Sequence, residues 1–183
     1  MLGALVLSPT TLEPIINEMG LKYNIEPAMI KGIIKAESNW DVNASRYEAH
    51  KGDASWGLMQ LLLATARGVL GISGLTTTQL IQPRVNIEAG TKLMAQNWDK
   101  FGNLRDAVAA YNAGTPRLGK DGKYVNAAYV DKVMKNYERY KTLGTVVGNV
   151  AINVEEAVTS QESIPVYMLL LVGVAGLVIV TRE

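Results

Sequence analysis

Apolar residues recur at helical spacing along most of the first 142 residues, and the most regular run follows Pro27. Four apolar side chains lie on what would be one face of a helix: Met29, Ile30, Ile33 and Ile34. The proline stands in the first turn, where a helix tolerates the loss of an amide hydrogen. The pattern therefore predicts a helix over residues 27–37 with a buried apolar face.

Glu37 continues that apolar face by one more turn, because it follows Ile33 by four positions and Ile34 by three. A carboxylate on a buried face is poorly solvated, which disfavours its charged form and raises its pKa. A general acid that works near neutral pH needs such a shift. The alternative is that Glu37 ends the helix and turns toward solvent.

Five further helices are predicted from the same periodicity, over residues 11–22, 61–71, 86–100, 103–113 and 126–141. Asn86 and Asn103 are expected to cap the third and the fourth, since an asparagine side chain accepts hydrogen bonds from free amides at a helix start. Gly20 is a candidate early end for the first helix, and Gly114 ends the fourth. The polar segments between these helices are expected to be loops or turns: residues 38–56, 71–85 and 116–124.

The composition of the chain excludes only a few kinds of functional site. With 183 residues and a net charge of +1, the chain is long enough for one domain with a true core. Residues 1–142 contain 17 Lys and Arg and 13 Asp and Glu, which gives a net charge of +4. Residues 143–183 contain one Arg and four Glu, which gives a net charge of −3. There is no cysteine, which excludes disulfides and thiolate metal sites. The single His50 excludes a multi-histidine zinc site and is expected in a loop.

Three short motifs follow one another along the chain: Glu37-Ser38, Gly57-Leu58-Met59-Gln60 and Ala110-Tyr111-Asn112-Ala113-Gly114, with Tyr129-Val130 after them. In order and approximate spacing, this set resembles the lytic transglycosylases, which are similar in fold to goose-type lysozymes and cleave bacterial peptidoglycan. The resemblance covers roughly residues 10–142. It implies a mainly α, lysozyme-like domain with a small irregular or β element beside the cleft.

The resemblance also implies residue roles. Glu37 would protonate the glycosidic oxygen between N-acetylmuramic acid and N-acetylglucosamine, and would then take the proton of the muramoyl C6 hydroxyl, which closes a 1,6-anhydro ring. Six residues would orient the sugars or the glutamate: Ser38, Met59, Gln60, Tyr111, Asn112 and Tyr129. No metal or organic cofactor is implied. By pattern alone, Met59 fits a core position better than a sugar contact, and Tyr111 fits either.

The chain departs from the family pattern at three places, one of which is Leu63, where a proline is common and only the start of a helix is affected. It has about five more residues than typical members between Glu37 and Gly57, which brings Asp41, Glu48 and Asp53 toward the cleft, and it has Val42 where a proline is usual. The pair Val125-Asn126 also stands where many members have Glu-Thr. The last difference bears on Tyr129, because that pair precedes the tyrosine expected to reach the catalytic carboxylate.

Two other functions stay open at this point. One is a goose-type hydrolase in which Asp41 or Asp53 holds a water molecule for inverting attack, so that the product is a reducing end. The other is a non-catalytic membrane or virion protein that keeps the fold in order to bind glycans. Retention of Glu37 with all three motifs favours an enzyme.

The C-terminal region has a different composition. Residues 143–163 contain no basic residue and many valines, which is typical of a tether or a loosely packed, strand-like linker. Residues 164–180 are 17 consecutive uncharged, mainly apolar residues, and predict a transmembrane helix, the alternative being a buried core helix. The expected organisation is a catalytic domain over residues 1–142, a linker over 143–163 and an anchor over 164–180.

Partners and location follow from this organisation. We expect the chain to bind peptidoglycan strands and, through residues 164–180, a lipid membrane; no nucleic-acid partner is expected. Residues 1–9 are apolar but lack the basic start of a secretory signal, and are expected to pack on the domain. An anchored enzyme without an export signal fits the internal membrane of a phage virion, where it would open the wall during entry. The bacterial cell envelope is the alternative location.

Overall fold

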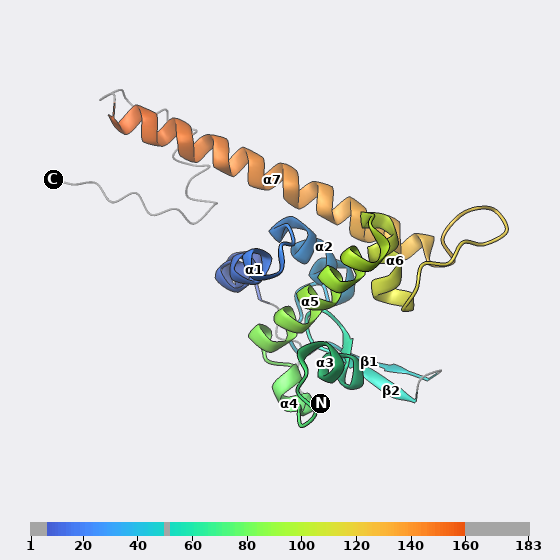
Figure 1. Ribbon diagram of the computed structural model, residues 1–183. Helices are drawn as coiled ribbons and strands as arrows, with labels where there is room; N and C mark the ends of the chain where they lie inside the picture. Colours follow the sequence, from blue (N-terminus) through green and yellow to red (C-terminus); the bar gives the residue numbers. More distant parts are fainter. Residues whose placement is uncertain (1–6, 50–51, 160–183) are drawn as a thin grey trace. The chain divides into compact units, whose positions relative to one another are not determined.

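The computed structural model describes residues 7–49 and 52–159, and side chains as far as residue 146. The chain divides into two units, residues 1–138 and 139–183. The first is mainly helical and includes one small sheet, as the sequence predicts (Figure 1). Three predictions from the sequence fall outside the described residues: the packing of residues 1–6, the placement of His50, and the membrane helix over residues 164–180.

Helix α2 (Pro27–Glu37) is the most buried helix at the centre of the first unit. Its isoleucines Ile30, Ile33 and Ile34 have no exposed surface, which confirms the predicted apolar face. Helix α1 (Pro9–Tyr23) packs against α2 and against α5 (Pro83–Phe101). Gly20 does not end α1 early, since the helix continues to Tyr23. The absence of a side chain at Gly20 instead makes room for the Ile25 carbonyl.

A three-stranded antiparallel sheet occupies the polar segment after α2. Its strands are β1 (Ser45–Glu48), β2 (Asp53–Trp56) and β3 (Leu61–Leu62), in the order β1-β2-β3. Ser45 pairs with Trp56, and Ser55 pairs with Leu62. The additional residues between Glu37 and Gly57 therefore extend a hairpin, which agrees with the small β element that the family resemblance implies.

Three helices complete the framework: α3 (Leu63–Leu70), α4 (Thr77–Leu80) and α6 (Leu104–Ala113). Asn103 caps α6, as predicted, by accepting a hydrogen bond from the Asp106 amide at 2.8 Å. The predicted loop over residues 71–85 instead contains α4, which begins with a Thr76–Gln79 capping box. Gly114 ends α6 with a φ of 79°.

Asn86 is not a helix cap. Helix α5 begins at Pro83, whose fixed φ suits a first helical position, and Asn86 is fully buried one turn further on. The prediction failed because an asparagine before an apolar run has the same sequence pattern whether it caps a helix or stands inside it. The nearby proline was the better signal for the start of the helix.

Helix α7 begins at Ala127 and continues to Thr159, well past the predicted end near residue 141. The strand-like interpretation of residues 143–163 is therefore wrong as far as residue 159. The valines suggested a strand, but extending an existing helix costs little, and the segment contains no proline. No helix among the described residues is long and apolar enough to cross a membrane. The three-part division of the chain stays a prediction.

The first turns of α7 lie closely along α2. A side chain at Gly32 would place its Cβ atom 3.0 Å from the Tyr137 backbone nitrogen and 3.3 Å from the Val133 carbonyl oxygen. The Gly32 carbonyl also accepts a hydrogen bond from the Asn136 side chain at 3.3 Å. A larger residue at Gly32 would therefore crowd the α7 backbone, and this close approach helps to fix what α7 presents to the end of α2.

Candidate active site

Glu37 is the last residue of α2, and α7 holds it in place. The Tyr129 hydroxyl donates a hydrogen bond to Oε1 of Glu37 at 2.7 Å. One turn further along α7, the Lys132 ammonium donates to the Ala36 carbonyl at 2.5 Å, where a cation also suits the negative end of the α2 dipole. Both bonds come from residues more than ninety positions away in sequence, so tertiary packing positions the carboxylate.

Burial raises the pKa of the Glu37 carboxyl above its ordinary value. The hydrogen bond from Tyr129 and the positive charges of Arg46 and Lys132 act in the opposite direction, while the negative charge of Glu48 raises the pKa further. Because burial is the largest of these effects, the net shift is upward. Glu37 can therefore keep its proton at a higher pH than an exposed glutamate, as a general acid requires.

A cleft of about 700 Å³ opens beside Glu37. Three other predicted site residues line it: Gln60, Tyr111 and Asn112. Further polar residues that the family motifs did not identify also line it: Arg46, Glu48, Ser55, Arg117 and Asn126. One carboxylate with a raised pKa thus lies in a long polar cleft, which suits a ligand with many hydroxyl groups better than a small apolar one.

Gln60 closes a network at the base of the hairpin. Its side-chain amide donates to the Ala44 and Gly57 carbonyls at 3.0 and 2.9 Å, and its side-chain oxygen accepts from the Ser55 hydroxyl at 2.9 Å. The backbone here is unusual, with φ values of 76° at Gly57 and 47° at Gln60. Gln60 therefore lines the cleft while its side chain fixes the loop on which the hairpin depends.

Asn86 stabilises the same loop from beneath. Its side-chain oxygen accepts from the Met59 amide at 2.7 Å, and its side-chain nitrogen donates to the Trp56 and Leu80 carbonyls at 2.9 and 3.0 Å. A Cβ atom at Gly57 would lie 2.5 Å from that nitrogen. Asn86 therefore positions the motif that contains Gln60, although family motifs did not identify it.

Three of the six predicted substrate-binding residues do not line the cleft: Ser38, Met59 and Tyr129, and the last of these bonds to Glu37 instead. The Met59 side chain is fully buried, and a Cβ atom at Gly90 would lie 2.3 Å from its sulfur. Ser38 follows α2, and its hydroxyl donates to the Ile34 carbonyl at 3.2 Å. We therefore assign Met59 to core packing and Ser38 to the end of α2.

Tyr111 and Asn112 lie at the end of α6, facing the cleft. The Tyr111 hydroxyl donates to the Met59 carbonyl at 2.9 Å, which links α6 to the Gly57–Gln60 turn. The Asn126 side-chain nitrogen donates to the Asn112 side-chain oxygen at 3.1 Å. Burial raises the pKa of both Tyr111 and Tyr129 well above the ordinary value, so each stays a neutral hydroxyl donor.

Of the acidic residues expected near the cleft, only Glu48 lines it. Arg46 and Glu48 stand two residues apart on β1, so their side chains share one face of the strand, and Nε of Arg46 lies 2.8 Å from Oε1 of Glu48. Asp41 accepts a hydrogen bond from the Asn43 amide at 3.0 Å, and Asp53 accepts from the Ala54 amide at 2.7 Å. Within the described residues, no group of three His, Asp or Glu side chains is arranged to hold a metal ion.

A mainly helical domain with one half-buried glutamate in a polar cleft is typical of lysozyme-like, glycan-cleaving enzymes. Residues 14–134 match the family model described as the transglycosylase SLT domain, and the chain belongs to this family, that of the lytic transglycosylases. The fold is similar to that of an inactive mutant of the lytic transglycosylase Slt from Pseudomonas aeruginosa, with a TM-score of 0.59 and 25% identity, over 73% of this chain and 24% of that one.

Two relatives illustrate the range of similar proteins. A transglycosylase of Enterobacteria phage PRD1 is 33% identical over 115 residues, which cover 63% of this chain and 38% of the phage protein. A lysozyme g of Epinephelus coioides is 26% identical over 152 residues, which cover 69% of this chain and 73% of that protein. The chain thus spans less than two thirds of the phage relative and of the Pseudomonas structure.

Proposed function

We propose that this chain cleaves the β-1,4 bond between N-acetylmuramic acid and N-acetylglucosamine in peptidoglycan and leaves a 1,6-anhydromuramoyl end. Glu37 protonates the leaving glycosidic oxygen while positive charge develops on the muramoyl ring. The resulting carboxylate then accepts the proton of the muramoyl C6 hydroxyl as that oxygen bonds to C1. One carboxylate therefore acts first as acid and then as base, and no water molecule enters the product.

The observation that carries this proposal is the bond between the Tyr129 hydroxyl and Glu37, at 2.7 Å, beside the polar cleft. It fixes one carboxylate oxygen and leaves the second oxygen of the same group for proton transfer. Burial meanwhile raises the pKa of the Glu37 carboxyl, so its acid form persists to a higher pH than that of an exposed glutamate. Gln60, Tyr111 and Asn112 stand where they can orient the sugars.

Mass spectrometry of the muropeptides that the full chain releases from purified peptidoglycan tests the chemistry. We expect products that carry the anhydro end, which has one water less than a reducing end. Glu48 is the second carboxylate in the cleft and forms an ion pair with Arg46, so the product analysis also tests whether a second carboxylate activates water there. Reducing ends in place of anhydro ends would establish a hydrolase and overturn the proposal.

We also propose that residues 164–180 anchor the enzyme in a membrane and that it opens the cell wall locally during phage entry. The support is the run of 17 uncharged residues and the similarity to a transglycosylase of phage PRD1. Deleting residues 164–183 is expected to release the enzyme from phospholipid vesicles without loss of muropeptide release. Vesicle binding that persists after the deletion would overturn the anchor, and the role in entry would lose its main support.

A further inference from the structure

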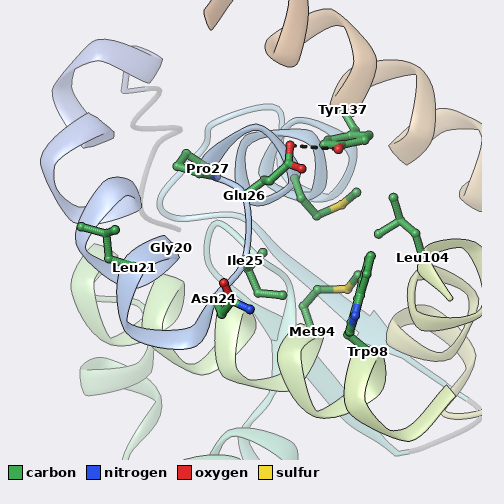
Figure 2. A pocket seen from close by; sticks show the side chains of 11 residues that line it. Gly20, Leu21, Asn24, Ile25, Glu26, Pro27, Met94, Trp98, Leu104 and Tyr137 are labelled. Atoms are coloured by element: carbon green, nitrogen blue, oxygen red, sulfur yellow. Dashed lines mark hydrogen bonds between the residues drawn. The ribbon is translucent and has the colours of Figure 1, made fainter. Parts of the chain in front are cut away.

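A second pocket, of about 460 Å³, lies apart from the cleft and shares no lining residue with it (Figure 2). The two cavities adjoin opposite ends of α2, which at 1.5 Å per residue places Pro27 about 15 Å from Glu37. On α5, the neighbouring residues Leu93 and Met94 line the cleft and the second pocket, respectively. The cleft chemistry described above makes no use of this second pocket.

The pocket has an apolar floor and a polar rim. Ile25, Met29 and Met94 form a floor of almost fully buried side chains. Trp98 extends from α5 with 42% of its surface exposed, which is high for so large an aromatic residue. Figure 2 shows the Trp98 and Met94 side chains together on α5, with the hydrogen-bonded Glu26 and Tyr137 on the other side of the pocket.

Two polar groups on the rim come from the α1–α2 connection. Asn24 ends α1 in a left-handed conformation with a φ of 53°, and Glu26 precedes the first turn of α2. The Tyr137 hydroxyl donates to Oε2 of Glu26 at 2.9 Å, which orients that carboxylate. A carboxylate has about four acceptor positions, so it can accept hydrogen bonds from several donors at once.

These features indicate which kind of ligand the pocket can bind. An acyl chain or an apolar peptide segment would satisfy the floor but would remove water from Glu26 and Asn24 without replacing its hydrogen bonds, which is costly. A strongly polar ligand would not use the Trp98 ring or the methionines. The pocket fits a ligand that has an apolar face and hydroxyl or amide groups at its edge.

We propose that this pocket is a second binding site for the N-acetylated sugars of a peptidoglycan strand. The sugar ring and acetamido methyl group would lie against Trp98, and ring substituents would donate to Glu26. The wall contains many strands, so a second site apart from the cleft raises the effective concentration of enzyme at the substrate without touching the bond that is cleaved. This inference rests on the proposed function, because it takes the glycan of that substrate as its ligand.

Retention on insoluble peptidoglycan tests the proposal. Full chains that carry Glu37→Gln, which blocks cleavage, are compared with and without Trp98→Ala at increasing amounts of peptidoglycan. Truncating an aromatic residue at the centre of a binding site weakens binding on the order of tenfold, so we expect the amount needed for half retention to rise by about that factor. Ile72→Ala, an exposed apolar residue at neither cavity, is the matched control and should leave retention unchanged.

Glu26→Gln keeps the shape of the rim and is the second test variant if Trp98→Ala fails to fold. It is also expected to weaken retention on peptidoglycan. Equal retention of the folded Trp98→Ala, Glu26→Gln and Ile72→Ala chains would overturn the second site. The second site would also be overturned if Trp98→Ala weakened binding to phosphatidylglycerol vesicles and left retention on peptidoglycan unchanged. The proposed function is tested separately, because it fails only if the wild-type chain releases no anhydro-muropeptides.

Discussion

The Tyr129 hydroxyl lies 2.7 Å from Oε1 of Glu37, although the two residues are 92 positions apart in sequence. Removing the carboxyl tests its role directly. Glu37→Gln keeps the shape and an acceptor for Tyr129 but cannot transfer the proton, so we expect muropeptide release to fall on the order of 10²–10⁴-fold. A rate equal to that of the wild type would remove Glu37 from the mechanism.

The same substitution should change how stability depends on pH. Because the folded state raises the pKa of Glu37, ionising it in place is unfavourable, and the folded protein loses stability relative to the unfolded chain as pH rises through that raised pKa. Glu37→Gln has no such charge. Its melting temperature relative to wild type should therefore increase as the pH rises above the ordinary glutamate pKa, measured by circular dichroism. A constant difference would mean that the carboxyl pKa is not raised by folding.

Tyr129→Phe removes one hydroxyl and leaves the ring in place. Losing a hydrogen bond of about 1 kcal/mol should lower turnover on the order of tenfold while leaving the free energy of unfolding within about 1 kcal/mol. Since the bond lowers the Glu37 pKa, its loss should also move the high-pH decline of activity to higher pH. A large fall in melting temperature with unchanged turnover would instead identify a core tyrosine.

Asn86 and Asn97 offer a matched pair on α5. Asn86→Ala leaves three backbone groups without this partner, two of them in buried bonds, so we expect the free energy of unfolding to fall by about 3 kcal/mol. Asn97→Ala loses one long bond, of 3.4 Å to the Ala107 carbonyl, and should cost about 1 kcal/mol. Urea unfolding distinguishes the two, and equal losses would show that Asn86 does not stabilise the Gly57–Gln60 turn.

Gly32→Ala tests the contact between α2 and α7. The added Cβ atom meets the α7 backbone, so we expect a loss of about 1–3 kcal/mol in stability together with lower turnover, because Tyr129 moves with α7. Gly68→Ala, in the middle of α3 with no neighbour within 4 Å, should stabilise the protein by about 0.5–1 kcal/mol. If both variants behave alike, the close approach is not what positions Tyr129.

Periodicity and motifs predicted the parts of the site that follow a local pattern. The spacing of the isoleucines in α2 predicted that Glu37 lies on the buried face, and the order of the motifs predicted that Tyr111 and Tyr129 lie near it. Asn86 was missed because three-way bonding to distant backbone groups leaves no sequence signal. Glu48 was expected near the cleft, but its ion pair with Arg46 was missed because it depends on the strand alternation of a hairpin that differs from the usual family length.

Tyr129 and Lys132 stand one turn apart on α7, and both bond to the last turn of α2. A chain that grows from its N-terminus contains Glu37 long before it contains either of them. A nascent chain that ends before residue 129 lacks both the hydroxyl that orients the carboxylate and the ammonium on the end of α2. A chain that ends at residue 129, 130 or 131 has the hydroxyl but lacks the ammonium. The acid is therefore positioned only when nearly all of the first unit has been synthesised and has folded, so an incomplete translation product is an inactive one.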